Sequence, residues 1–177
     1  GLASGINAGT YASNIAVNGA DAGNYTIGIT NANLVVQKAN LVLSGSRAYD
    51  GGTTFAGAFL TAAGVNNETF AVTGLGDHSN LTNKNVAANQ AVALNSVTGL
   101  ALGSSSNGGL STNYNALSTA GSSVSLSLKS ASVTGTSTQL VYNGHVQTQQ
   151  AATTSGFVGG DVITVSGLAS GKNAGIY

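Results

Sequence analysis

The sequence predicts an all-β protein made of tandem Ig-like antiparallel β-sandwich modules, with a β-solenoid as the alternative. Three observations support this. Short stretches alternate apolar and polar residues, Gly and Asn separate these stretches, and the pattern returns after about 90 residues. Alternation with a period of two is typical of half-buried strands, and many short strands separated by turns are typical of a sandwich. A period of this length favours separately folded units over a solenoid of short repeats.

The expected strands follow the alternation along the chain. They cover residues 14–17, 25–29, 34–36, 69–73, 90–94, 123–128 and 162–166. Two-residue hairpin turns are expected at Asp50-Gly51 and Asn143-Gly144, because type I′ turns need positive φ at both central residues. The chain has no Pro, so Gly, Asn and Asp must supply the unusual turn dihedrals.

Internal repeats organise the chain, and the two ends show the first of them. Residues 1–11 and 167–177 are identical at nine of eleven positions. Residues 49–74 also align without a gap with residues 142–167, at an offset of 93 (142 − 49 = 93). Tyr49 corresponds in this way to Tyr142.

A third correspondence covers the other part of the repeat. Asn24-Tyr25 corresponds to Asn113-Tyr114, and Lys38 corresponds to Lys129 (129 − 38 = 91). We therefore expect residues 1–39 to be the C-terminal half of one module. Residues 40–130 should be a complete module, and residues 131–177 the N-terminal half of a following one. The end halves would be completed by neighbouring sequence or by head-to-tail copies, unless the structural boundary differs from the repeat phase.

The composition excludes several kinds of partner. Only 6% of residues are charged, with five cations and five anions, so the surface must be covered by Ser, Thr, Asn, Gln and Gly. Nucleic-acid binding needs clustered Lys and Arg, which are missing, so no nucleic-acid partner is expected. No apolar run reaches the length of a membrane span, so no membrane insertion is expected.

The chain has no Cys, which excludes disulfides, thiolate metal sites and thiol nucleophiles. It also begins with Gly and carries no recognisable signal peptide, which suggests a piece of a longer protein.

The repeated motifs resemble a known family. Residues 48–54 (AYDGGTT), then Lys84-Asn85-Val86, then residues 19–26 (GADAGNYT) are similar in order and spacing to the YDG and MBG repeat domains. These domains occur in tandem in large bacterial adhesins that resemble filamentous haemagglutinin. The resemblance implies an extracellular or cell-surface location and a role in adhesion or biofilm formation, and it implies nothing about a catalytic site. The last module departs from the pattern, with Asn143 in place of Asp50.

Chemically active groups are scattered, so we expect no enzyme, no catalytic residue, no cofactor and no metal. His78 and His145 occupy unrelated repeat positions, and a catalytic triad would need Ser, His and a carboxylate to converge. No Asp-rich calcium loop is present. Glu68 and Asp161 correspond by repeat, and a structural turn is the expected role, with a calcium ion between modules as the alternative.

The repeated tyrosines allow two interpretations. We expect the pairs Tyr49/Tyr142 and Tyr25/Tyr114 to pack on the module with their hydroxyls hydrogen-bonded. As the alternative, they would form a platform for stacking sugars. The sequence therefore predicts a stalk or fibre repeat of a secreted adhesin that spaces a binding region from the cell. The alternative is a carbohydrate-binding module that recognises extracellular polysaccharide or a host surface.

Overall fold

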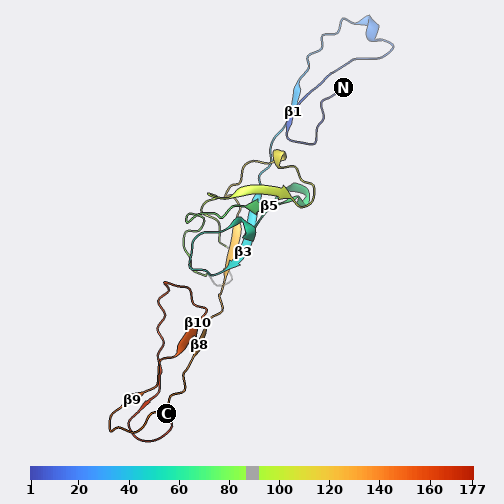
Figure 1. Ribbon diagram of the computed structural model, residues 1–177. Coiled ribbons are helices and arrows are strands. Elements are labelled where there is room, and N and C mark those ends of the chain that lie inside the picture. Colours follow the sequence, from blue (N-terminus) through green and yellow to red (C-terminus); the bar gives the residue numbers. More distant parts are fainter. Residues whose placement is uncertain (87–91) are drawn as a thin grey trace.

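The computed structural model describes residues 1–86 and 92–177 of an elongated all-β chain (Figure 1). A compact central module (residues 40–130) lies between an N-terminal segment (residues 1–39) and a C-terminal segment (residues 131–177). Among the described residues, the helices are 3-10 turns of three residues: η1 (Ala22–Asn24), η2 (Gly57–Phe59), η3 (Val65–Asn67) and η4 (Ser111–Asn113). The all-β prediction is confirmed at this level.

The central module is built on one five-stranded sheet. Its strands lie in the order β6 (Ala101–Ser105), β5 (Thr69–Thr73), β4 (Leu60–Ala63), β3 (Val42–Ala48) and β7 (Ser123–Ser127). The first three pairings are antiparallel, but β3 and β7 are parallel, with Ser44 opposite Ser123 and Ala48 opposite Ser127. The sheet is therefore mixed rather than wholly antiparallel as expected. A parallel pair needs a long crossover connection, and β4 to β6 supply it.

One face of this sheet is buried. Along β3, β4, β5 and β7, alternate residues point to the same side, so a period-two pattern buries one face and leaves the other exposed. The buried residues of these strands are Leu43, Arg47, Leu60, Ala62, Phe70, Val72, Val124 and Leu126.

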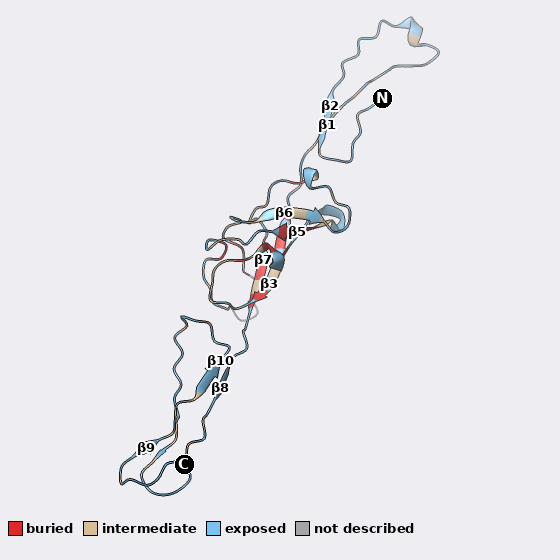
Figure 2. Cartoon of the chain, viewed as in Figure 1, coloured by how far each residue is buried: buried red, intermediate tan, exposed pale blue. Residues whose placement is uncertain are grey.

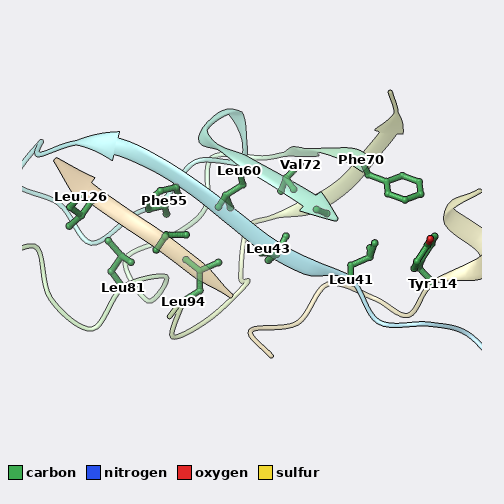
Figure 3. Close-up of a cluster of buried hydrophobic side chains, with 12 residues drawn as sticks. Leu41, Leu43, Phe55, Leu60, Phe70, Val72, Leu81, Leu94, Tyr114 and Leu126 are labelled. Atoms are coloured by element: carbon green, nitrogen blue, oxygen red, sulfur yellow. The ribbon is translucent and has the colours of Figure 1, made fainter. Parts of the chain in front are cut away.

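Irregular segments cover the buried face (Figure 3). Phe55, Leu81, Leu94 and Tyr114 come from connections between strands and complete the hydrophobic core. The N–H of Leu81 donates to the carbonyl of Thr53 at 2.9 Å, which ties two of these connections together. The second layer of the module is thus mainly loop rather than a second sheet.

The two end segments have ladders but no core (Figure 2). In the N-terminal segment, β1 (Gly9–Ala12) pairs antiparallel with β2 (Asn33–Val36). In the C-terminal segment, β8 (Ser132–Thr134) pairs with β10 (Thr153–Ser155), and β9 (Gln147–Thr148) pairs with β11 (Ser170–Gly171). The buried hydrophobic residues of the described chain all lie between Leu41 and Leu126.

Strand prediction succeeded where a partner strand is present. The strands expected at residues 34–36, 69–73 and 123–128 correspond to β2, β5 and β7. The strands expected at 14–17, 25–29 and 162–166 are wrong, because these residues lie outside any described ladder. The strand expected at 90–94 lies partly outside the described residues, and its Val92 forms an isolated antiparallel bridge with Val124. Alternation alone overlooked β3, β4 and β6 in the central sheet, and β1, β8, β9, β10 and β11 in the end segments.

Candidate functional site: repeated turns and the junctions between modules

The first repeated turn is built by Asp50 and Asn143. Asp50 Oδ1 accepts the N–H of Gly52 at 2.9 Å, and Asn143 Oδ1 accepts the N–H of His145 at 3.0 Å. The intervening glycines have the same left-handed conformation, with φ of 83° at Gly51 and 78° at Gly144. Both are Asx turns, in which a side-chain oxygen imitates a backbone acceptor.

The two-residue hairpins predicted at these sites are wrong. Asp50 and Asn143 are not among the described residues with positive φ, so neither turn is of type I′. The strands β3 and β4 do pair, but the connection between them runs from Tyr49 to Phe59. The Asx hydrogen bond explains why Asp and Asn are interchangeable here, because each offers an oxygen at the same place.

A buried arginine that the sequence did not single out holds the central copy of this turn. Arg47 Nη1 lies 2.6 Å from Asp50 Oδ1, and Nη2 donates to the carbonyl of Gly52 at 2.8 Å. The guanidinium carbon also lies 5.5 Å from the ring centroid of Phe55. Leu140 and Val141 precede Tyr142 where Arg47 and Ala48 precede Tyr49, so the C-terminal copy has no such arginine.

The second repeated turn ends at Glu68 and Asp161. The N–H of Glu68 donates to the carbonyl of Val65 at 2.9 Å, and the N–H of Asp161 donates to the carbonyl of Val158 at 3.2 Å. The residue before each acid has positive φ, 61° at Asn67 and 89° at Gly160. The offset is again 93 residues, as in the Asx turns.

The third repeated turn precedes Tyr25 and Tyr114. In each case a single 3-10 turn ends in a hydrogen bond from the tyrosine N–H, to Ala22 at 3.3 Å and to Ser111 at 3.2 Å. The tyrosine backbones agree closely, with φ of −126° and −120°. In both copies an upstream segment pairs antiparallel with the strand after the tyrosine: β1 with β2, and Val92 with Val124.

The side chains at these matched turns have different surroundings. Tyr114 is 3% exposed and packs edge-on against Phe70, with ring centroids 5.3 Å apart. Its hydroxyl donates to Glu68 Oε2 at 2.7 Å and accepts the N–H of Val65 at 3.0 Å. Burial and the Glu68 carboxylate raise the pKa of Tyr114. Tyr25 is instead 72% exposed, and Tyr142 is 61% exposed.

Tyr49 lies at the junction between the central module and the C-terminal segment. Its hydroxyl donates to Asp161 Oδ1 at 2.7 Å, and Lys84 Nζ donates to the same oxygen at 2.9 Å. Lys84 Nζ also lies 5.9 Å from the Tyr49 ring centroid. These hydrogen bonds lower the pKa of Asp161 and raise that of Lys84. Asp161 therefore has a second role besides ending its turn: it accepts hydrogen bonds from the central module across the junction.

The junction between the N-terminal segment and the central module is formed at Asn113 of the central module. Asn7 Oδ1 accepts from the side-chain amide of Asn113 at 3.0 Å, and the N–H of Ala8 donates to Asn113 Oδ1 at 2.9 Å. Asn113 precedes Tyr114, whose hydroxyl binds Glu68. Glu68 corresponds to Asp161. At each junction, therefore, the preceding unit contacts the following unit at or near this repeat position.

Other predicted chemical groups are dispersed. His78 and His145 are exposed, and His78 Nδ1 lies 3.5 Å from Thr54 Oγ1. Among residues 1–86 and 92–177, no three His, Asp or Glu side chains lie close enough to share a metal ion. In the same part of the chain no helix has the length and apolarity to cross a membrane.

Three Asn-X-Thr sequons for N-glycosylation occur, at Asn24, Asn67 and Asn80, and the one at Asn80 is closed to modification in the folded module. Asn80 is fully buried, and its side-chain amide donates to the carbonyls of Ser96 at 3.0 Å and Thr98 at 3.1 Å. Its carbonyl oxygen accepts the N–H groups of Phe55 and Asp77. Asn80 therefore holds three connections together beneath the sheet, a role that no periodic pattern predicted.

Comparison with protein-family models, with curated proteins and with solved structures finds no match. The arrangement itself positions backbone turns and joins consecutive units.

Proposed function

We propose that this chain is a spacer: a tandem array of β modules, each built on one sheet, forming part of the stalk of a secreted, surface-bound bacterial adhesin. The observation that carries the proposal is the recurrence of three backbone turns at nearly constant offsets. A chain that repeats a whole structural unit gains length, because each copy adds one unit to the array. The elongated arrangement of the three parts agrees with this role (Figure 1).

The junction contacts support a spacer of defined direction. Tyr49, Lys84 and Asp161 join consecutive units through charge-assisted hydrogen bonds, which are shorter and stronger than neutral ones. Units held by fixed contacts keep a longer end-to-end distance than units joined by a flexible linker. The neutral, polar surface keeps the array soluble with little charge-driven adhesion.

The proposal is tested by chain length. Proteins with one, two and four consecutive copies of residues 40–130 are compared by small-angle X-ray scattering. We expect the maximum dimension to grow in proportion to copy number. Collapse of the copies into a compact particle would contradict the spacer role.

The alternative function, carbohydrate binding, has one specific observation in its favour. A hollow of about 560 Å³ in the C-terminal segment is lined by Tyr142, Tyr177, Gln147 and Gln149, among others. Aromatic rings and amides are groups that recognise sugars. Binding of the intact chain to a glycan array, lost in Tyr142→Ala, would favour this alternative.

A further inference from the structure

Gly51 lies against the segment that follows the central module. A Cβ atom placed on Gly51 would lie 2.7 Å from Cγ1 of Val158 and 3.6 Å from its Cβ. Non-bonded carbon atoms keep a separation of about 3.5–4.0 Å, so a side chain on Gly51 would push Val158 away. Glycine is therefore needed here for a second reason, in addition to its left-handed φ of 83° in the Asx turn.

The corresponding glycine of the C-terminal segment separates these two reasons. Gly144 has nearly the same φ, 78°, and the same place in its own Asx turn. Among the described residues, a Cβ on Gly144 would meet only the Tyr142 hydroxyl, at 4.0 Å. The close approach at Gly51 thus comes from the junction and not from the turn.

Val158 belongs to a turn that forms with or without such a contact. The N–H of Asp161 donates to the carbonyl of Val158, as the N–H of Glu68 donates to the carbonyl of Val65, 93 residues earlier (158 − 65 = 93). Val65 is 54% exposed, whereas Val158 is half-buried, although it lies in the segment without a core. The turn is therefore preformed, and the contact with Gly51 accounts for the better burial of its valine.

Asp161 adds polar contacts beside this apolar one. Its Oδ1 accepts from the Tyr49 hydroxyl at 2.7 Å and from Lys84 Nζ at 2.9 Å. The Lys84 side chain is 43% exposed, so solvent screens the ion pair and it orients the segment only weakly. The fit of Val158 against Gly51 thus sets the position of the turn, and the hydrogen bonds require an acid three residues after the valine.

The covalent connection supplies a separate point of attachment. β7 ends at Ser127 and β8 begins at Ser132. A Cβ on Gly156 would lie 2.6 Å from the carbonyl oxygen of Ser130, so the path to Val158 starts against this connection. Units joined by a linker alone move relative to each other, and a second contact point restricts that motion.

We propose that residues 158–161 are a latch that docks on a seat formed by Tyr49, Gly51 and Lys84 and fixes the angle between consecutive units. The partner that fits the seat is a turn with an apolar residue three positions before an acid. Gly51 is the positioning residue of this interface. The latch rests on the proposed spacer role and gives that spacer a stiff joint.

Distances between two spin labels test the latch, and the chain has no native Cys to interfere. The labels are placed at Leu75→Cys in the central module and Thr154→Cys on β10, both at exposed positions. Adding Gly51→Asn should widen the distance distribution about twofold, because Asn tolerates the left-handed φ but its Cβ displaces Val158. Gly144→Asn is the matched control and should leave the width unchanged. Equal widths in these two variants would overturn the proposal.

Val158→Ala breaks the same contact from the other side. We expect the distribution to widen while the unfolding temperature of the central module stays the same. With Gly51→Asn added, the width should not exceed that of the wider single variant, because both changes remove one contact. An unchanged width in Val158→Ala would overturn the proposal even if Gly51→Asn disturbed the central module.

The latch and the spacer role fail differently. If tandem copies lengthen in proportion to copy number but neither Gly51→Asn nor Val158→Ala widens the distribution, only the latch is wrong. If the tandem copies collapse while both variants widen the distribution, the latch stands and the spacer role falls.

Discussion

The central module and the end segments share backbone turns but not a core. Glu68 and Asp161 end the same turn, and so do Tyr114 and Tyr25. In the central module buried Tyr114 donates to half-buried Glu68, while in the end segments Asp161 is half-buried and Tyr25 is exposed. The difference teaches that local sequence is sufficient for the turns, whereas the core needs residues from both halves of the repeat. Short ladders such as β1–β2 have marginal stability without such a core.

The largest effect should come from truncating a core side chain. Phe70→Ala removes a buried ring in contact with Tyr114, and we expect a loss of about 3–5 kcal/mol in the unfolding free energy. Ile163, its counterpart, is 48% exposed, so Ile163→Ala should cost less than about 1 kcal/mol. Urea denaturation of both variants measures the difference. Equal losses would show that the C-terminal segment has a core of its own.

Removing one hydroxyl should have a smaller effect. Tyr114→Phe leaves the Val65 N–H and the Glu68 carboxylate without their shared partner, at a cost of about 1–2 kcal/mol. Tyr25→Phe is the matched control and should change the stability of the dilute monomer by less than about 0.5 kcal/mol. A destabilisation by Tyr25→Phe that matches that of Tyr114→Phe would break the comparison.

The Asx turns should differ between the two copies. Asp50→Ala removes the acceptor of the Gly52 N–H and the partner of Arg47, so we expect a loss of about 1–2 kcal/mol. Asn143→Ala removes only the turn hydrogen bond in an exposed loop, and we expect less than about 0.5 kcal/mol. Thermal unfolding of both variants provides the measurement. The ranking would be contradicted by an Asn143→Ala loss as large as that of Asp50→Ala.

The junction contact should respond to pH without unfolding the central module. The pKa of Asp161 is lowered, so its contribution is complete above the ordinary carboxyl pKa and is lost as pH falls through the lowered value. The pKa of Lys84 is raised, so its contribution is complete below the ordinary ammonium pKa and is lost as pH rises through the raised value. The contact is therefore strongest between these limits.

Distances between spin labels on the central module and the C-terminal segment would report this contact. We expect the distance distribution to broaden in acid and at high pH. In Lys84→Met the high-pH change should disappear while the acid change remains, because Tyr49 still donates to Asp161. An unchanged pH profile in this variant would exclude Lys84 from the junction.

The sequence predicted the β class and the strands whose alternation is regular. Residues 123–128 alternate strictly and residues 69–73 alternate except at Ala71, and both form strands of the central sheet. β3 was missed because it starts in an apolar run and places Gly45 and Arg47 on its inner face, where alternation predicts large apolar residues. Residues 162–166 alternate as strictly as 69–73 but form no strand, since a ladder depends on a neighbouring strand as well as on its own pattern.

Part of the candidate site was also visible in the sequence. The nearly constant offsets identified the residue pairs at all three turns, but the type I′ turn was wrong because an Asx hydrogen bond gives the same sequence preference. Arg47 had no signal because its contacts are with backbone groups of an irregular turn, one and five residues along the chain. Asn80 had none because it acts on backbone groups 16 and 18 residues away. The junction role of Asp161 depends on Tyr49, 112 residues away, and on Lys84.

Amide hydrogen exchange on the dilute monomer tests most directly whether the core needs both halves of the repeat. The N–H groups of Tyr114 and Tyr25 make the same turn hydrogen bond, as do those of Glu68 and Asp161. We expect the central amide of each pair to exchange about a hundredfold more slowly or better, because it opens only when the core does. Equal exchange within both pairs would contradict the account.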